Sequence, residues 1–272
     1  MRRRILFSLT LLVTLAGLVW LASWPQATGP AEGTKLDCPA TWTAPAPRDS
    51  FRVGAFNIHG CTGPDGRRDI DRVADCVQDL DFVALNEVHG PRPWESDNQA
   101  ALLGRRLGVP WLFAPATRDW HSIDFGNGLL TSLPVESWRR VPLAASNGRG
   151  YRNAVLVRVR QGRWTISVLL THIARSDDVT RRAQLHEAID LYLAQPAPAV
   201  FLGDLNSEAE EPEIRRLLAA PGVIDAVGQK LGSNAPPRID FVFVRGLRVL
   251  DAGLRDLGAS DHPLAWAEVT TE

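Results

Sequence analysis

The chain has 272 residues, of which 45% are hydrophobic, so it can bury one large core or at most two small ones. It contains 30 basic and 31 acidic residues, and three of the arginines come before residue 5. The rest of the chain therefore carries a net charge of −4. This charge excludes the strongly basic balance with which some proteins bind a phosphate backbone without sequence preference.

The N-terminal residues predict export from the cytoplasm. Arg2, Arg3 and Arg4 precede an uncharged, apolar run over residues 5–23. A membrane helix needs ~20 apolar residues, whereas the apolar part of a secretory signal usually has only ~7–15. The basic end should stay in the cytoplasm, so the rest of the chain should face outward. Residues 1–24 are therefore expected to be a membrane anchor or a cleaved signal, which leaves the protein either membrane-anchored or secreted and periplasmic.

Residues 25–50 are rich in proline, alanine, threonine and glycine, which predicts an extended tether without a core of its own. The chain has three cysteines, Cys38, Cys61 and Cys76. An oxidising compartment would permit one disulfide among them, but their spacing does not select a pair. Their spacing also lacks the paired Cys/His pattern that is typical of a zinc site.

The remainder of the chain predicts a mixed α/β domain. Apolar runs bounded by turn residues predict strands over residues 51–57, 82–85, 111–114, 124–131, 153–159, 164–170, 199–202, 238–244 and 247–254, with a closing strand from residue 264. Helical spacing predicts helices over residues 70–77, 98–107 and 179–193, with a further helix from residue 211. Strands and helices alternate only at first, so we expect packed mixed sheets with helices outside.

Polar residues follow several of these apolar runs. The run at 199–202 ends in Gly203-Asp204-Leu205-Asn206. Both polar side chains should stand free at the carboxyl end of the strand, where open α/β sheets usually place their sites. Taken alone, this pattern more often forms a turn before a helix. The other polar strand ends are Asn57, Glu87, Asn127, His172, Asp240, Asp261 and His262.

The order of these motifs resembles the endonuclease/exonuclease/phosphatase superfamily. The motifs are Asn57, Leu85-Asn86-Glu87, Gly126-Asn127-Gly128-Leu129-Leu130, Thr171-His172, Gly203-Asp204-Leu205-Asn206, Ile239-Asp240-Phe241 and Ser260-Asp261-His262. Each motif alone is weak evidence, but seven in the same order are specific. The resemblance spans residues 51–269. It implies a four-layer α/β sandwich of two packed mixed β-sheets flanked by helices, with residues 51–272 as the catalytic domain of a divalent-metal-dependent phosphoesterase.

The residues present suit that chemistry. A carboxylate after a buried strand, such as Glu87, must be solvated, paired or bound to a metal, because burying a lone charge is costly. The resemblance implies that Glu87 binds the metal, supported by Asn57 and Asp261. Hard oxygen ligands without a cysteine or histidine cage suit Mg²⁺, with Mn²⁺ as the second choice.

For the activation of water, the resemblance implies that His262 is the general base and that Asp240 orients its ring. Asp204 is the competing base, and Asn206 would position the water or the phosphate. His172 would donate to the phosphate or assist the leaving group.

Two further residues are predicted to contact the phosphate. Arg152 matches an arginine of secreted deoxyribonucleases, although an exposed arginine at a strand end explains it equally well. Asn127 lies between two glycines that permit close approach of the backbone, although a plain turn also explains them. The chain departs from the family at Asn86, where glutamine is common, at Leu205, which replaces phenylalanine, and at Ser132, which replaces a basic residue. These departures bear on substrate contacts more than on the reaction.

The sequence therefore predicts an exported phosphoesterase, expected to be a monomer. Its substrate would be nucleic acid, a phospholipid or a phosphorylated small molecule, and the mild acidity leans slightly away from duplex DNA. The alternative is a catalytically silent binding or scaffold module on the same fold. That alternative predicts loss of the metal and histidine positions, and this chain keeps Glu87, Asp204, Asp240 and His262.

Overall fold

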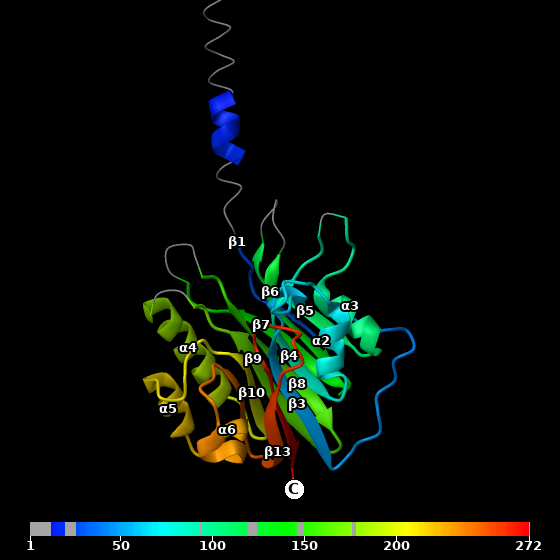
Figure 1. Ribbon diagram of the computed structural model, residues 1–272, viewed down its shortest axis with the longest axis vertical. Coiled ribbons are helices and arrows are strands. Elements are labelled where there is room, and N and C mark those ends of the chain that lie inside the picture. Colours follow the sequence, from blue (N-terminus) through cyan, green and yellow to red (C-terminus); the bar gives the residue numbers. More distant parts are fainter. Residues whose placement is uncertain are drawn as a thin grey trace, which may run out of the picture.

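A computed structural model describes residues 12–19, 26–92, 94–118, 124–145, 150–175 and 178–271. Two sheets of seven strands each pack face to face, with helices outside them (Figure 1). This architecture confirms the predicted four-layer sandwich.

The strands of the first sheet come from both ends of the domain. They are β1 (Gln26–Ala27), β3 (Ser50–Asn57), β4 (Phe82–His89), β5 (Trp111–Arg118), β6 (Phe125–Thr131), β13 (Arg248–Arg255) and β14 (Leu264–Thr270). Their order across the sheet is β1-β5-β6-β4-β3-β14-β13. Only β3 and β4 pair in parallel. Because the carboxyl ends of parallel strands meet at one edge, Asn57 lies beside Asn86.

The second sheet repeats this arrangement. Its strands are β2 (Ala31–Gly33), β7 (Val135–Pro142), β8 (Asn153–Gln161), β9 (Trp164–His172), β10 (Ala199–Asp204), β11 (Val223–Asp225) and β12 (Asp240–Arg245). Their order is β11-β12-β10-β9-β8-β7-β2, and only β9 and β10 pair in parallel. The register places Asp204 beside both His172 and Asp240.

Apolar side chains fill three layers. Alternate residues of β3, such as Val53, are buried between the two sheets, whereas Phe56 is buried against the outer helices. Helices α2 (Ile70–Val77) and α3 (Gln99–Leu107) cover the first sheet, and α4 (Asp178–Leu193) and α5 (Pro212–Leu218) cover the second (Figure 1). Helix α6 (Ala226–Leu231) closes one end of the core between the sheets. Two 3₁₀ turns, η1 (His59–Cys61) and η2 (Gly232–Asn234), complete the domain.

The strands and long helices lie where the sequence predicted them, whereas β7, β11 and α6 were not predicted. Strand β7 contains Arg139 and Arg140, and its residues are mostly half-buried because only the short strand β2 lies beyond it. It therefore lacks the alternation of buried and exposed residues by which a strand is recognised.

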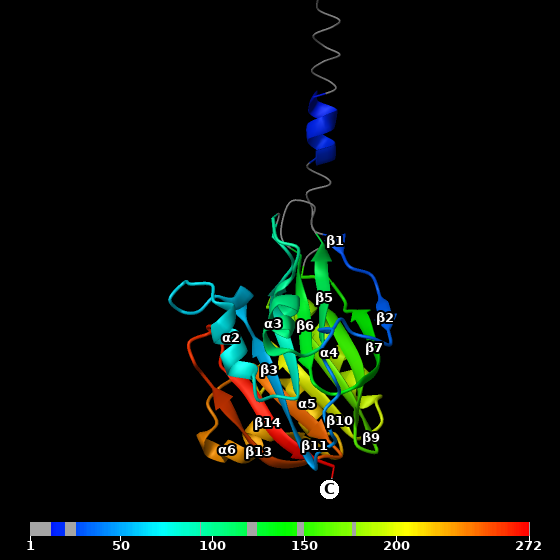
Figure 2. The same ribbon diagram turned by 90° about the vertical axis from the view of Figure 1, so that its right-hand side faces the viewer.

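The segment predicted as a tether contributes an edge strand to each sheet. Strand β1 pairs with β5 and β2 pairs with β7, and both lie on the same side of the molecule in Figure 2. Asp37 also forms a β-bridge with Trp111. Part of this segment therefore lies against the domain, and the tether stays a prediction. The three cysteines are free; Cys61 and Cys76 are buried, and Cys38 is exposed.

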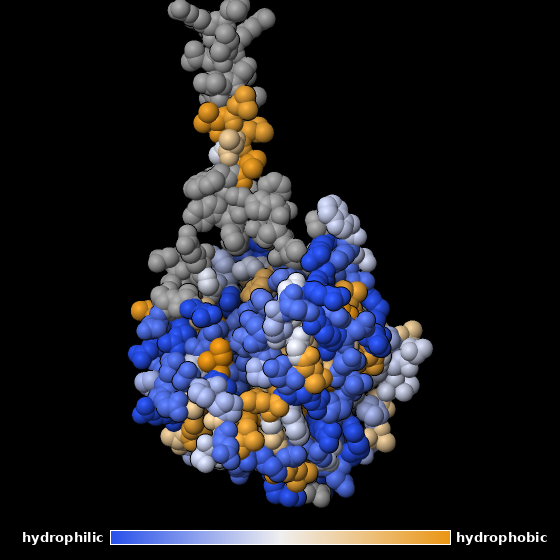
Figure 3. Space-filling view, in the orientation of Figure 1, coloured by the Kyte–Doolittle hydropathy of each residue, from blue (hydrophilic) through white to orange (hydrophobic). Residues whose placement is uncertain are grey.

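Residues 12–19 are helical, and Leu12, Val13 and Leu15 are exposed. Figure 3 shows this segment mostly in the colour of hydrophobic residues. The other residues of the predicted anchor, 1–11 and 20–24, lie outside the described residues. Within the part of the chain that the structure describes, no helix combines the length and the apolarity needed to cross a membrane. The membrane anchor and export stay predictions.

Candidate active site

Glu87 lies in an irregular part of β4. The register with β6 shifts between Leu85 and Val88, and Glu87 has a φ of +56°. A left-handed conformation is unfavourable for a residue with a Cβ. The register shift is typical of a β-bulge, and β-bulges often redirect side chains near active sites. The Glu87 carboxylate accepts a hydrogen bond from Asn57 Nδ2 at 3.2 Å.

Asn57 connects the two sheets at the site. Its Nδ2 also donates to Asp204 Oδ2 at 3.0 Å, and its Oδ1 accepts from the backbone N–H of His59 at 3.0 Å. Only 2% of Asn57 is exposed. One buried amide therefore holds a carboxylate of the first sheet and a carboxylate of the second sheet close together.

The end of β10 requires a glycine. Gly203 has a φ of +143°, and a Cβ on it would lie 1.9 Å from the carbonyl oxygen of Thr171. Only glycine lets β10 run this close to β9 just before Asp204. Asp204 Oδ1 then accepts from the backbone N–H of Asn206 at 2.9 Å, which shapes the loop after the strand.

His172 is buried beside this loop. Its Nε2 lies 3.2 Å from Asn206 Nδ2 and 3.5 Å from Asp204 Oδ2. Burial, together with the positive charges of Arg152 and His262, lowers the pKa of His172 well below its usual value. The ring is therefore neutral at neutral pH, and its Nε2 accepts from the Asn206 amide.

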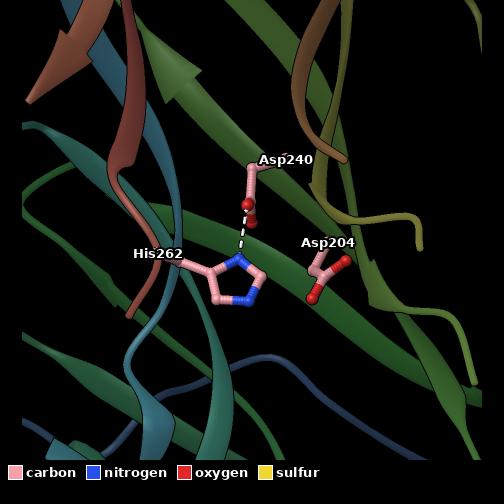
Figure 4. A group of neighbouring side chains, drawn as sticks. All are labelled: Asp204, Asp240 and His262. Carbon is pink, nitrogen blue, oxygen red and sulfur yellow. Dashed lines mark hydrogen bonds and ion pairs between the residues drawn. The ribbon is translucent and has the colours of Figure 1, made fainter. Parts of the chain in front are cut away.

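His262 and Asp240 form the pair that the sequence predicted. His262 Nδ1 lies 2.6 Å from Asp240 Oδ2, and Asp204 lies beside the ring (Figure 4). Burial alone would lower the pKa of His262, but the hydrogen bond to Asp240 and its charge raise that pKa to about 9. Burial, and then the charge of Asp240, raise the pKa of Asp204 to about 7. Burial also raises the pKa of Asp240.

The donors at this site fit a divalent cation. Within the described residues, one group of at least three acidic, histidine or cysteine side chains has ligand atoms that all lie within 4.8 Å of one another: Asp204, Asp240 and His262 (Figure 4). Asp240 Oδ1 is buried without a hydrogen-bond partner among the described residues. Burial raises the pKa values of Asp204 and Asp240, and a bound cation would stabilise their charged forms. Asn57 Nδ2 donates to both Glu87 and Asp204 and so links Glu87 to this group. The carboxylate oxygens are ligands that suit a hard divalent cation.

Asp261 is more exposed than these carboxylates, although its charge acts on Asp240 and His262. Its side chain is 54% exposed and lies 3.5 Å from His59 Nδ1. Its closest link to the cluster is Ser260, whose Oγ lies 3.2 Å from Asp261 Oδ1 and donates to the carbonyl of Asn57 at 2.7 Å. Of the three predicted metal ligands, the structure brings Glu87 and Asn57 together and leaves Asp261 at the rim.

Asn127 is buried beneath the site. It is 1% exposed, its Oδ1 accepts from Asn86, and its Nδ2 donates to both oxygens of Asn153. Asn86 in turn donates to the carbonyl of Thr171 and accepts from the backbone N–H of Asp204 at 2.9 Å. These hydrogen bonds join the two sheets and favour a scaffold role for Asn127, while its contact with the phosphate stays a prediction.

Arg152 reaches the site without an ion-pair partner among the described residues. Its guanidinium lies 5.2 Å from the ring centroid of Phe125, which also packs against His172. Burial lowers the pKa of Arg152, while the charges of Glu87 and Asp204 act in the opposite direction. A half-buried cation near these carboxylates suits a phosphate oxygen. Phe125 was not predicted, because nothing in the sequence around it marks one aromatic residue as part of a site.

Solved structures share this fold. An endonuclease/exonuclease/phosphatase from Beutenbergia cavernae DSM 12333 superposes with a TM-score of 0.65 at 24% identity, over 82% of this chain and 72% of that chain. Truncated Caenorhabditis elegans TDP2 gives 0.60 at 21% identity, over 81% and 97%. D. rerio TDP2 complexed with single strand DNA product gives 0.61 at 18% identity, over 82% and 100%. A search among curated proteins finds no match.

A family model covers most of the domain. The model of the Endonuclease/Exonuclease/phosphatase family matches residues 54–262, a span that begins within β3 and ends at His262. It therefore includes every candidate site residue described above. Since this span is more than half of the chain, and since the fold agrees, the chain belongs to the Endonuclease/Exonuclease/phosphatase family.

Proposed function

We propose that the protein is a divalent-metal-dependent phosphodiesterase that hydrolyses its substrate by attack of water on phosphorus. Family membership supports the general class of phosphoester hydrolase. The observation that carries the specific proposal is the convergence of Glu87, Asp204, Asp240 and His262 from separate strand ends, linked by Asn57 and by the Asp240–His262 hydrogen bond.

Glu87 would hold the cation, supported by Asn57, and Mg²⁺ is the ion that oxygen ligands favour, with Mn²⁺ second. When bound, the cation would polarise a phosphoryl oxygen and offset the negative charge that develops on it. Arg152 would contact another phosphate oxygen, because its guanidinium lacks a carboxylate partner among the described residues.

Two residues are candidates for the general base. A His262 with a pKa of about 9 carries a proton at neutral pH, which favours it as a donor to the phosphate. Asp204, with a pKa of about 7, is poised to accept a proton from water. We therefore favour Asp204 as the base in this geometry, with His262 oriented by Asp240 as the proton donor. The reverse assignment, with His262 as the base, is the competing proposal.

His172 and Asn206 would act beside the base. The neutral His172 ring and the Ile173 carbonyl hold the Asn206 amide, and Asn206 in turn lies against Asp204. We propose that Asn206 positions the attacking water. A direct contact between His172 and the phosphate stays a prediction. Because only 3% of His172 is exposed, a role in orienting Asn206 is the simpler proposal.

Nucleic acid is the first substrate class to examine. The domain resembles D. rerio TDP2, whose structure holds a single strand DNA product, and this likeness motivates single-stranded DNA as a probe. The net charge of −4 outside residues 1–24 leans away from duplex DNA. Phospholipids and phosphorylated small molecules are the other two classes, and a phospholipid suits a protein held at a membrane.

Export from the cytoplasm, by a membrane anchor or a cleaved signal, is also proposed. It is supported by Arg2, Arg3 and Arg4 ahead of the apolar run at residues 5–23. Fractionation of cells that express the full chain tests it, because recovery in the cytosol would contradict it. We expect a monomer, which size-exclusion chromatography with light scattering would check.

The central experiment measures hydrolysis of bis-p-nitrophenyl phosphate by the full chain with Mg²⁺ or Mn²⁺, and after EDTA treatment. We expect metal-dependent turnover that His262→Ala abolishes. Parallel assays on single-stranded DNA, plasmid DNA, RNA, sphingomyelin and inositol phosphates identify the substrate class. A folded, metal-binding protein that hydrolyses none of these would favour the silent scaffold instead.

A further inference from the structure

Arg181 on helix α4 holds the loop that carries Asn206. Only 14% of its side chain is exposed. Its Nη1 donates to the carbonyl of Asn206 at 3.0 Å, to Ser207 Oγ at 2.7 Å and to Glu211 Oε2 at 2.6 Å. Its Nη2 donates to Asp178 Oδ1 at 2.9 Å. One guanidinium therefore joins α4, the loop after β10 and the residue that precedes α5.

The loop turns sharply at Asn206. Its φ of +46° lies in the left-handed region, which asparagine enters more readily than most residues with a Cβ, and hydrogen bonds hold it there. Its backbone N–H is fixed by Asp204 Oδ1, and its side chain is fixed by the carbonyl of Ile173. Arg181 makes the one hydrogen bond to the Asn206 carbonyl found in the described part of the chain.

We propose that Arg181 is a positioning residue for hydrolysis, acting through Asn206. By binding the Asn206 carbonyl, it keeps the loop in the conformation in which Asn206 Nδ2 lies 3.2 Å from His172 Nε2 and the Asn206 N–H meets Asp204. The inference rests on the proposed function, in which Asp204 and Asn206 act on the attacking water. It adds a residue that has no contact with Asp204, Asp240 or His262 in the described part of the chain.

The chemistry favours arginine here over lysine. The planar guanidinium lets Nη1 share its two N–H groups among the Asn206 carbonyl, Ser207 and Glu211 while Nη2 is held in a fixed direction by Asp178. An ammonium group is a compact point charge, which can keep the Glu211 ion pair but cannot hold the carbonyl in the same geometry.

The next residue along α4 is a matched control. Arg182 is also an arginine of the first turns of this helix, but it is 52% exposed. Its Nε lies 3.7 Å from Glu213 Oε1, and within the described part of the chain no contact joins it to the loop. Arg182→Gln therefore removes the same charge from the same helix without touching Asn206.

The experiment compares Arg181→Gln, Arg181→Lys and Arg182→Gln in the full chain, with bis-p-nitrophenyl phosphate and Mn²⁺. We expect Arg181→Gln to lower kcat by about tenfold to a hundredfold, because small displacements of a catalytic group carry losses of that order, while KM changes less than about twofold. Arg181→Lys should recover part of the loss, and Arg182→Gln should leave both constants unchanged. An equal effect of the two glutamine variants would overturn the inference.

A double-mutant cycle tests whether Arg181 acts through Asn206. In an Asn206→Ala background, Arg181→Gln should cause no further loss of kcat, since the group that it positions is gone. Losses that multiply would show that Arg181 works elsewhere, and the inference would fail while the proposed function stands.

Amide hydrogen exchange gives a readout that does not depend on turnover. Exchange of residues 203–208 should become faster in Arg181→Gln and Arg181→Lys than in wild type, with Arg182→Gln unchanged. If wild type hydrolysed no phosphoester but this exchange pattern appeared, the loop restraint would stand and the proposed function would fail. Unchanged exchange in both Arg181 variants would overturn the inference whatever the activity.

Discussion

The two sheets contribute unlike halves of the site. From the first sheet comes Glu87, which is half-buried and has a strained backbone at φ +56°. From the second come Asp204 and Asp240, which are 1% and 3% exposed and whose pKa values are raised by burial. The two halves therefore differ most in electrostatic cost, which the second half carries.

This difference suggests a division of roles. A half-exposed carboxylate can exchange water for a cation at little desolvation cost, so Glu87 suits the entry of the metal. Buried carboxylates hold protons at a pH where exposed ones have lost them, so Asp204 suits proton transfer. Asn57 contacts both halves and makes them one site.

The largest effect is expected at the buried half. Asp204→Asn keeps the size of the side chain but removes the proton acceptor, so kcat for bis-p-nitrophenyl phosphate should fall by about 10²- to 10⁴-fold. Mn²⁺ binding, measured by calorimetry, should weaken less than catalysis does. Retention of most of the activity would assign the base to His262 instead.

Substitution of Glu87, the half-buried carboxylate, should weaken metal binding more than it affects the chemical step. Glu87→Gln should weaken Mn²⁺ binding by about tenfold or more, because the charged ligand becomes neutral, and excess Mn²⁺ should restore part of the activity. Calorimetric titration and activity at rising Mn²⁺ concentrations check this. If activity is lost while Mn²⁺ affinity is unchanged, Glu87 is not the metal ligand. The division of metal binding and proton transfer between the two sheets would then fail.

The scaffold beneath both halves should affect stability, not substrate binding. Asn127→Ala removes hydrogen bonds to Asn86 and Asn153 and leaves buried polar groups without partners. We expect a loss of about 1–3 kcal/mol in the free energy of unfolding, measured by urea denaturation, with KM unchanged. A raised KM with unchanged stability would restore the phosphate contact that the sequence suggested.

The strand-end residues could be predicted because their signal is local. A polar side chain directly after an apolar run stands out in the sequence, and this pattern located His172 and Asp204, whereas Asp240 stands at the start of a strand and His262 just before one. The pairing of His262 with Asp240 came from the family resemblance and agrees with their 2.6 Å contact. The parallel pairs β3–β4 and β9–β10 then bring the strand ends to one edge.

Other features depend on contacts between distant residues, and no local pattern reports them. The left-handed backbone of Glu87 follows from the shifted register between β4 and β6. The commitment of Asn127 to Asn86 and Asn153 joins three strands that are far apart in the sequence. Asp261 follows Ser260 directly and yet faces solvent, since the sequence marks a polar residue at a strand end but not its direction.

The smallest predicted effect is a pH dependence of stability at the buried half in the presence of EDTA. The pKa of His262 is raised to about 9 in the folded protein, above its usual value near 6.5. The folded state therefore keeps a proton that the unfolded state has lost, and its stabilising contribution is present below pH ~6.5 and is lost as the pH rises towards about 9. Below pH 6.5, the lowered pKa of His172 opposes the raised pKa of Asp204; above neutrality, the remaining titration of Asp204 has the same sign as that of His262 and fades by about pH 8.

Urea denaturation between pH 7 and pH 9 should therefore show a free energy of unfolding that falls with pH, by at most about 1.4 kcal/mol per unit from this one proton. His262→Gln should flatten the slope, because the titrating group is gone. His186 on α4 offers a control, since its ring is 57% exposed and lies outside the site, and His186→Gln should leave the slope unchanged. A wild-type slope equal to that of His262→Gln would mean that the Asp240 carboxylate does not hold the proton on His262, and the electrostatic contrast between the two halves of the site would lose its basis.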